Sequence, residues 1–153
     1  MITRVRELTR TITQLYEQLA DLVKQVAPHL LAEKGLGVLI AAKLLGEIAG
    51  IDRFTSAAQL ARISGCAPIP VSSGRTDRHR LDPGGNRQLN HAFHMLAMTK
   101  ILHDSRTAVY IAKQRSNGKT NKKAIRNLKR RLVPRVYHLL RDPNRIPTTI
   151  CLP

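Results

Sequence analysis

The first 28 residues carry apolar side chains at the alternating three- and four-residue spacing of a heptad repeat. These side chains are Val5, Leu8, Ile12, Leu15, Leu19, Leu22 and Val26. Polar residues fill most positions between them, so the pattern predicts one amphipathic helix with a narrow apolar seam. Pro28 ends it, because the residue before a proline is disfavoured in the helical region. Either a second copy or the chain's own domain must cover such a seam, and the strict spacing favours self-association in a coiled coil.

Helical periodicity continues through most of the remaining chain. Further helices are expected at about 30–34, 38–48, 55–65, 86–101, 105–117 and 121–141. Thr55 or Ser56 is expected to cap the third of these, Asn86 to start the fourth and Ser105 to cap the fifth. We therefore predict an all-α fold.

The predicted fold has three parts. A coiled-coil helix covers residues 1–28, a basic helical bundle with an exposed loop covers 29–141, and residues 142–153 form a tail without periodicity. The bundle is the part expected to carry the functional residues.

A glycine-flanked turn separates two of the predicted helices. Gly35-Leu36-Gly37 has the pattern of a helix-hairpin-helix over about residues 30–49. Such a turn leaves no side chain between backbone and ligand, and the N–H groups that begin the second helix can hold a phosphate. Gly35 and Gly37 are therefore predicted to form a sequence-independent clamp on a DNA backbone. The alternative is a plain helical hairpin whose glycines serve only the turn.

The chain is strongly basic, and the charge is concentrated in its second half. The net charge is +16; residues 1–74 hold 8 basic and 6 acidic side chains, whereas residues 75–153 hold 18 and 4. Such a field attracts polyanions, and each cation that meets a phosphate releases counterions. A solvated basic face or a membrane-surface protein is the alternative, but nucleic acid fits better because the cations interleave with turn and helix signals.

Contact with the DNA backbone is the expected mode of binding. Aromatic residues make up 3% of the chain and there is no Trp, which argues against single-strand binding by rows of stacked bases. The side chains expected to contact DNA, besides the turn glycines, are Arg78, Arg80, Asn86, Arg87, Lys122, Lys123, Arg126, Lys129 and Arg130. The two distant cysteines, and the absence of a signal peptide or an apolar span, lead us to expect a soluble cytoplasmic protein without membrane contact.

Residues 66–85 interrupt the helical pattern with prolines, glycines and polar side chains. The prolines argue against a central strand, so a long exposed loop is expected. Ser72 and Ser73 precede Gly74 in this loop, and several cations follow directly: Arg75, Arg78, His79 and Arg80. Guanidinium groups can hold a phosphodiester while an activated serine attacks it, with His79 as the proton acceptor. The alternative is an ordinary Ser-Gly turn with basic neighbours.

No metal site is predicted in this chain. Only four carboxylates follow Gly74, and most lie beside an arginine, whereas a two-metal nuclease needs several acids that converge. His91 and His94 have the spacing of metal ligands, but no third ligand completes a set at a convincing distance.

The ordered runs GLGVLIAAKLLGEI, FTSAAQLARISGCAP, SSGRTDRHR and GGNRQLN resemble a known family. They are similar to the C-terminal domain of the IS-one-ten class of insertion-sequence transposases, the bridge-RNA-guided recombinases related to the pilin-gene invertase. The resemblance covers about residues 30–141, and the heptad helix matches the coiled coil that leads into that domain. It implies DNA transposition, with Ser73 as the nucleophile, Ser72 as the fallback and Arg75 and the other loop cations around it. It also implies DNA and a structured guide RNA as partners.

The chain departs from this family in two ways. Asp77 and Asp82 stand where the family usually has glycine or basic residues. Family members also carry an N-terminal RuvC-like domain in which four acidic residues hold divalent metal, whereas this chain begins at the coiled coil. We therefore expect a partial transposase, inactive alone, with no cofactor of its own and with Mg²⁺ confined to the acidic domain. The alternatives are a non-catalytic helix-hairpin-helix DNA-binding module and an RNA-associated basic protein.

Overall fold

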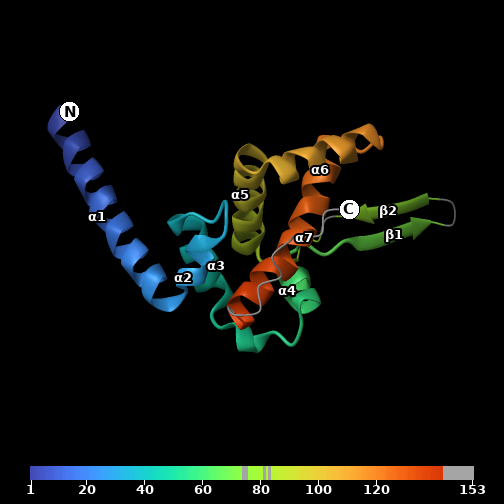
Figure 1. The fold of residues 1–153 in the computed structure, drawn as a ribbon, viewed down its shortest axis with the longest axis horizontal. Coiled ribbons are helices and arrows are strands. Elements are labelled where there is room, and N and C mark those ends of the chain that lie inside the picture. The colour runs from blue at the N-terminus through green and yellow to red at the C-terminus, as the bar shows by residue number, and fades with distance from the viewer. Residues whose placement is uncertain (74–75, 81, 83, 143–153) are drawn as a thin grey trace.

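The computed structural model describes residues 1–73, 76–80, 82 and 84–142, and describes side chains in this part of the chain outside residues 70–80. The elements, in chain order, are α1 (Ile2–Val26), α2 (Pro28–Ala32), α3 (Val38–Ile48), the 3₁₀ turn η1 (Ile51–Arg53), α4 (Ala57–Ile63), β1 (Ile69–Ser73), β2 (Thr76–Arg80), α5 (Arg87–His103), α6 (Ser105–Ser116) and α7 (Asn121–Arg141) (Figure 1). The predicted all-α class is confirmed for the body of the molecule, to which the structure adds one hairpin of two strands.

Local capping explains where the helices begin. The Ser56 hydroxyl accepts from the amide of Gln59 at the start of α4, and the Asn86 side chain accepts from two amides at the start of α5. The predicted cap of α6 was wrong by one residue. Asp104, not Ser105, has the extended backbone of a cap, and its carboxylate accepts from the amide of Arg106 and the hydroxyl of Thr107. A carboxylate also complements the positive end of the helix dipole.

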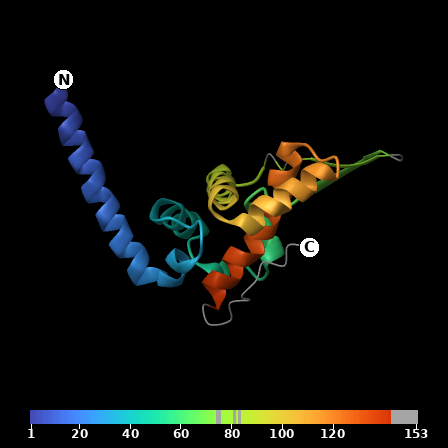
Figure 2. The ribbon, with the colours of Figure 1, turned by 45° about the horizontal axis from the view of Figure 1, so that its top comes forward.

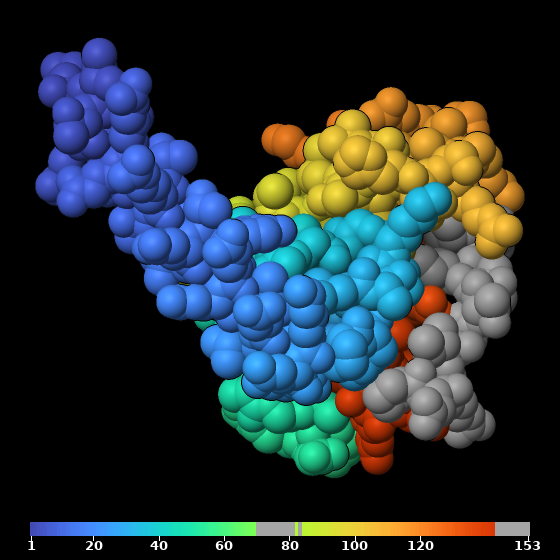
Figure 3. Space-filling view, turned by 60° about the vertical axis from the view of Figure 1, so that its left-hand side comes forward, coloured from blue at the N-terminus to red at the C-terminus, as the bar shows by residue number. Residues whose placement is uncertain are grey.

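Helix α1 projects from the rest of the molecule as an arm (Figures 1 and 2). The single helix predicted for the heptad segment is confirmed, and Val23 is its buried residue. The seam itself faces solvent: the exposed large apolar residues of α1 include Val5, Leu8, Ile12, Leu15, Leu22 and Val26. Figure 3 shows the amino-terminal part of the arm standing clear of the body. The chain alone therefore does not cover the seam.

The core lies where α5 meets the helices around it. Helix α5 packs against α3, α6 and α7, and α4 packs against α7. Side chains with at most 1% exposure fill the centre, among them Leu44, Leu60, Leu89, Phe93, Leu96, Leu128 and Leu132. The apolar faces of α3, α5 and α7 meet there, as amphipathic helices require.

Strands β1 and β2 form an antiparallel hairpin that extends away from the body on the side opposite α1 (Figures 1 and 2). Ile69 pairs with Arg80 at its base, and Ser73 pairs with Thr76 near its tip. The irregular loop predicted for this region is therefore wrong in its main part. Prolines are excluded from central strands, but both strands of a two-stranded hairpin are edge strands, where Pro70 is tolerated.

Candidate nucleic-acid interface

Helices α6 and α7 carry a concentration of cations and no carboxylate of their own between Ser105 and Arg141. Residues 105–141 contain twelve lysines and arginines and no Asp or Glu. Eight exposed cations of α6, the first half of α7 and the connection between them form what we call the α6–α7 surface: Arg106, Lys113, Arg115, Lys119, Lys122, Lys123, Arg126 and Arg130. Arg141 is also exposed, but it lies at the far end of α7, where its guanidinium donates to the carbonyl of Thr55 at 3.4 Å. Because like charges repel unless an anion lies between them, this surface is suited to a polyanion.

Side-chain contacts hold α6 and α7 together. The Arg115 guanidinium donates to Oδ1 of Asn121 at 2.7 Å, and Asn127 donates to Oε1 of Gln114 at 3.2 Å. The Arg131 guanidinium lies 5.2 Å from the centre of the Tyr110 ring. These contacts span the connection and the facing sides of the helices, so they fix the spacing of the surface cations.

Lys129 was predicted to contact DNA, but the structure does not place it on the α6–α7 surface. Its side chain is 6% exposed, and its ammonium donates to Oδ1 of Asn90 on α5 at 2.7 Å. Burial lowers the pKa of Lys129, and the positive charge of Arg126 lowers it further, against an opposing contribution from Cys66. The position follows Leu128 and precedes Leu132, so it belongs to the apolar stripe of α7.

The two glycines of the predicted clamp have different surroundings. Gly35 has φ +90°, and a Cβ there would lie 2.9 Å from Cγ of Lys100, so both conformation and packing require glycine. Gly37 precedes α3, and a Cβ there would meet nothing within 4 Å. No side chain in the described part of the chain caps α3 by a hydrogen bond. The structure thus explains Gly35 by packing against α5 and leaves the side of Gly37 open.

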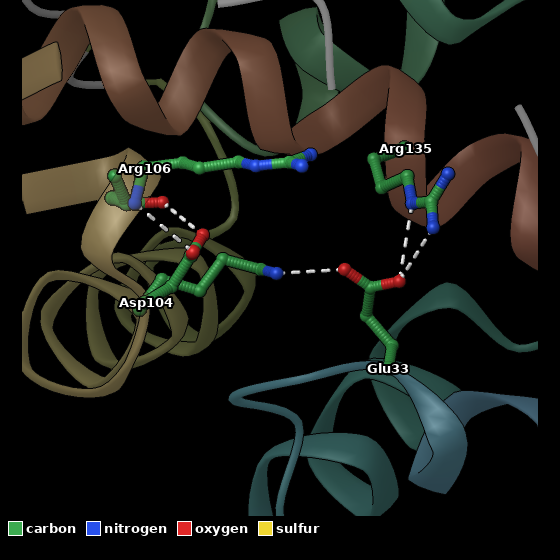
Figure 4. Close-up of polar contacts among 6 residues, drawn as sticks. Glu33, Asp104, Arg106 and Arg135 are labelled. Carbon is green, nitrogen blue, oxygen red and sulfur yellow. Dashed lines mark hydrogen bonds and ion pairs between the residues drawn. The ribbon is translucent and has the colours of Figure 1, made fainter. Parts of the chain in front are cut away.

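Glu33 joins the turn before α3 to two other helices (Figure 4). Its carboxylate accepts from the ammonium of Lys100 on α5 at 2.7 Å and from the guanidinium of Arg135 on α7 at 2.7 Å. Burial alone would raise the pKa of Glu33, but the hydrogen bonds and charges of Lys100 and Arg135 outweigh it and hold the pKa below its ordinary value. This ion-pair group anchors the turn to the core.

Asn86 and Arg87 lie at the start of α5, as predicted, but they differ in availability. Asn86 accepts from the amides of Gln88 and Leu89 and donates to Oε2 of Glu47 at 2.7 Å, so its side chain already serves the fold. Arg87 is exposed. Of this pair, Arg87 is therefore the residue whose exposed side chain is available to contact a ligand.

The predicted catalytic residues that the structure describes lie on the two strands of the hairpin. Ser72 and Ser73 are on β1, and Arg78, His79 and Arg80 are on β2, but their side chains lie outside the described residues, as does the whole of Arg75. In the register, Ser73 pairs with Thr76 whereas His79 pairs with Pro70. Ser73 and His79 are thus three register positions apart, roughly 10 Å along the strands. The backbone brings the serines and arginines onto one hairpin but does not set His79 opposite Ser73.

The residues that the sequence interpretation missed are mostly buried polar ones. Lys100 is 3% exposed, and Asn90 hydrogen-bonds the end of α4 as well as Lys129. Lys100 in α5 and Lys129 in α7 each interrupt an apolar stripe at helical spacing. That interruption is the sequence signal that could have identified them as buried lysines. The exposed cations of α6 were also missed, although the long stretch without a carboxylate pointed to them.

Among the described residues, His91 and His94 have no third metal ligand beside them. Within the described part of the chain, no three His, Cys, Asp or Glu residues are grouped as a metal site. Nδ1 of His91 lies 3.5 Å from the ammonium of Lys43. Burial lowers the pKa of His94, with further contributions from the charges of Lys129 and His91. None of the helices in the described ranges is long and apolar enough to cross a membrane.

A family model and three curated proteins match this chain. The model is that of the Transposase IS116/IS110/IS902 family, and it matches residues 27–112, from the end of α1 into α6. A 43.6 kDa protein of insertion element IS110 from Streptomyces coelicolor is 33% identical over 148 residues, which cover 90% of this chain and 36% of that protein.

The other two relatives are also insertion-element proteins. A 42 kDa protein of IS900 from Mycobacterium paratuberculosis is 32% identical over 118 residues, or 76% of this chain and 30% of that protein. A 44.8 kDa protein of IS116 from Streptomyces clavuligerus is 30% identical over 109 residues, or 71% and 27%. The chain spans about a third of the length of these relatives.

Proposed function

This chain belongs to the Transposase IS116/IS110/IS902 family, and we propose that it forms the DNA-binding C-terminal part of a DNA transposase, with Ser73 as the nucleophile of strand cleavage and transfer. The observation that carries the binding part is the α6–α7 surface, whose cations are exposed and without an intervening carboxylate. The chemical part rests on family membership together with the sequence Ser73-Gly74-Arg75, which follows directly along the chain from β1.

The α6–α7 surface binds the phosphates of a duplex in this proposal. Cations spaced along two joined helices contact successive phosphates without reading bases, which gives affinity that falls with salt. The N-terminus of α3 supplies a second contact of the helix-hairpin-helix kind: it has no side-chain cap, and the side of Gly37 is open. Arg87 adds a cation at the start of α5.

The reaction proposed for Ser73 is a transesterification. Its Oγ forms a bond to the phosphorus of a phosphodiester, the bond from phosphorus to one sugar oxygen breaks, and that oxygen leaves with a proton. The guanidinium groups of Arg75, Arg78 and Arg80 stabilise the charge that develops on the phosphate oxygens. His79 remains the predicted proton acceptor, although three register positions separate it from Ser73.

The described residues do not fit a Mg²⁺ site, because they hold no group of three acidic, His or Cys side chains. No step of the reaction is therefore assigned to a metal in this part of the molecule. We propose instead that the acids which hold divalent metal belong to another domain, whether it lies in the same polypeptide or in a separate one. Strand transfer then requires both parts.

Pairing of two copies through α1 completes the proposal. The seam residues of α1 are exposed, and the strict heptad spacing suits a second helix of the same kind. Two copies would then present two α6–α7 surfaces to DNA, one from each chain. A structured guide RNA is a second polyanion that the same cations could bind.

Salt dependence tests the binding part. The full chain is titrated with a duplex at several salt concentrations, and the logarithm of the binding constant is expected to fall steeply and linearly with the logarithm of salt concentration. A slope near zero would contradict binding through the α6–α7 surface. Competition between the duplex and a structured RNA of equal length then decides which polyanion is preferred.

Covalent capture tests the chemical part against the rival function, a non-catalytic DNA-binding module. The chain is mixed with cleavable duplex and with the metal-holding domain of a relative. A covalent protein–DNA adduct is expected from the wild type and from Ser72→Ala, but not from Ser73→Ala, while all three bind duplex equally. An adduct lost in Ser72→Ala alone would move the assignment to Ser72. If none of the three forms an adduct, the non-catalytic DNA-binding module is the remaining function. The separation of Ser73 and His79 by three register positions favours that function, because it does not set a proton acceptor opposite the serine.

A further inference from the structure

The two ends of the hairpin segment cross in close contact at a pair of glycines. A Cβ built on Gly85 would lie 2.5 Å from the Cα and N atoms of Gly65. The amide of Asn86 donates to the carbonyl of Ile63 at 2.6 Å beside this crossing. The segments that lead into and out of the hairpin are therefore in contact at Gly65 and Gly85. We call this contact the hairpin root.

Asn90 ties the hairpin root to α7. Its Nδ2 donates to the carbonyl oxygens of Ser64 at 2.9 Å and Gly65 at 3.1 Å, and its Oδ1 accepts from the ammonium of Lys129 at 2.7 Å. This amide orientation is the favourable one. A flipped amide would face its oxygen toward two carbonyl oxygens and its NH₂ group toward an ammonium.

Burial of Lys129 at this position is unfavourable for the free energy of folding. A buried ammonium loses its hydration, and Asn90 is a neutral partner that does not offset the charge. An apolar side chain of similar length would pack there without that cost. What Lys129 provides that an apolar residue cannot is a donor that fixes the orientation of the Asn90 amide.

We propose that Asn90 and Lys129 are positioning residues that set the direction of the β1–β2 hairpin relative to α7. Figure 1 shows the hairpin projecting from the body, so its direction is set at the root. The five-residue strands reach roughly 17 Å, and a rotation of about 10° at the root moves the tip by about 3 Å. The functional meaning rests on the proposed function: the pair keeps Ser73 at a fixed distance from the phosphates held on α7.

The direction of the hairpin can be measured without DNA. Spin labels are attached at Thr76→Cys on β2 and Asn117→Cys after α6, in a chain with Cys151→Ser. Cys66 is kept, because it is buried and burial raises the pKa of its thiol, which limits its labelling. The wild-type background is expected to give one narrow distribution of distances between the labels.

Three substitutions in this background test the pair. Lys129→Met keeps the volume of the side chain and removes the donor, and Asn90→Ala removes the amide. Both are expected to broaden the distribution or shift it by about 3 Å or more. His91→Ala is the control on the same helix: next to Asn90, it removes an exposed polar side chain whose Nδ1 lies 3.5 Å from the ammonium of Lys43, and it should leave the distribution unchanged. Thermal unfolding is followed in the same samples. If Asn90→Ala does not fold, the result for Lys129→Met alone decides the test.

A second measurement separates positioning from binding. Duplex affinity and its salt dependence are expected to stay at wild-type values in Lys129→Met, because the α6–α7 surface is intact, while adduct formation through Ser73 falls about 100-fold. Unchanged label distances in Lys129→Met overturn the positioning role, whatever happens to the adduct. Changed distances with no adduct from the wild type would uphold the positioning role and reject the serine chemistry.

Discussion

Helices α1 and α7 are the two longest in the molecule, at 25 and 21 residues, and both are amphipathic, yet they use their apolar sides differently. Most apolar side chains of α7 are buried, whereas most of those of α1 face solvent; in α1, Val23 is buried and Leu19 is half-buried. The width of the stripe explains the difference. In α1 it is a narrow heptad seam, and in α7 it is broad enough to pack against α4, α5 and α6 together. An apolar stripe on a helix thus predicts a packing partner, and the width of the stripe indicates whether that partner lies in the same chain.

The two helices also differ in charge. Helix α1 mixes cations with Glu7, Glu17 and Asp21, whereas α7 has no acid at all. The mixed charge suits contact with another protein helix, and the unbalanced charge suits a polyanion.

Truncation in the stripe of α7 should cost far more stability than truncation in the seam of α1. Leu132 is fully buried, so Leu132→Ala is expected to lower the free energy of unfolding by about 2–5 kcal/mol. Leu15 is 54% exposed, so Leu15→Ala should change it by no more than about 0.5 kcal/mol. Urea denaturation followed by circular dichroism at low protein concentration measures both. Equal losses would mean that the body covers the seam of α1.

Charges placed in the seam should abolish self-association. Ile12→Lys together with Leu15→Lys is expected to weaken pairing by about 100-fold, because two apolar contacts per chain are lost from a coiled coil. Gln14→Lys with Gln18→Lys adds the same charge outside the seam and should have little effect. Sedimentation equilibrium compares the two variants with the wild type. A wild-type chain that stays monomeric at high concentration would refute the pairing.

Loss of cations from α7 should weaken DNA binding more than the same loss from α1. Replacing Lys122, Lys123 and Arg126 by Ala is expected to lower duplex affinity about tenfold near physiological salt and to reduce the salt slope by about 2 to 3. The matched triple replaces Arg4, Arg6 and Arg10, which are also exposed. Fluorescence anisotropy at several salt concentrations gives both quantities. Equal losses would assign binding to net charge and not to the α6–α7 surface.

The smallest expected effect is on the pH dependence of stability. The folded state lowers the pKa of Glu33, so its contribution is fully present above the ordinary value of 4.5 and is lost as pH falls through the lowered value. Glu33→Gln should therefore be less stable than the wild type at neutral pH, and the difference should shrink below about pH 4.5. Thermal unfolding from pH 7 to pH 3 measures this, with Glu17→Gln on α1 as the exposed control. A difference that stays constant with pH would contradict the ionic role of Glu33.

Most helices could be predicted because the signals that start and end them are local. The predicted bounds of α3 and α7 agree with the structure, and Asn86 begins α5 as expected, since a cap acts on amides two or three residues away. The β1–β2 hairpin could not be predicted. Its stretch lacks regular alternation of apolar and polar residues, and the pairing of its strands follows from how the ends are held.

The candidate site divides in the same way. Exposure of Lys122, Lys123, Arg126 and Arg130 follows from the periodicity of α7, and the structure agrees. Burial of Lys129 does not follow from composition, because a lysine is expected at the surface unless a specific partner accepts it. That partner, Asn90, lies 39 residues earlier in the chain.

The amino-acid order alone is enough to place the charge in the second half, start the helices at their caps and lay an apolar heptad seam along the first 28 residues. Each of these depends on residues within a few positions of one another. Packing was needed to show that α7 hides its stripe and α1 does not, that Glu33 holds Lys100 and Arg135, and that Gly65 and Gly85 touch at the hairpin root. Those contacts join segments about twenty to a hundred residues apart. The local sequence pattern carries no information about which distant segment packs against a given residue.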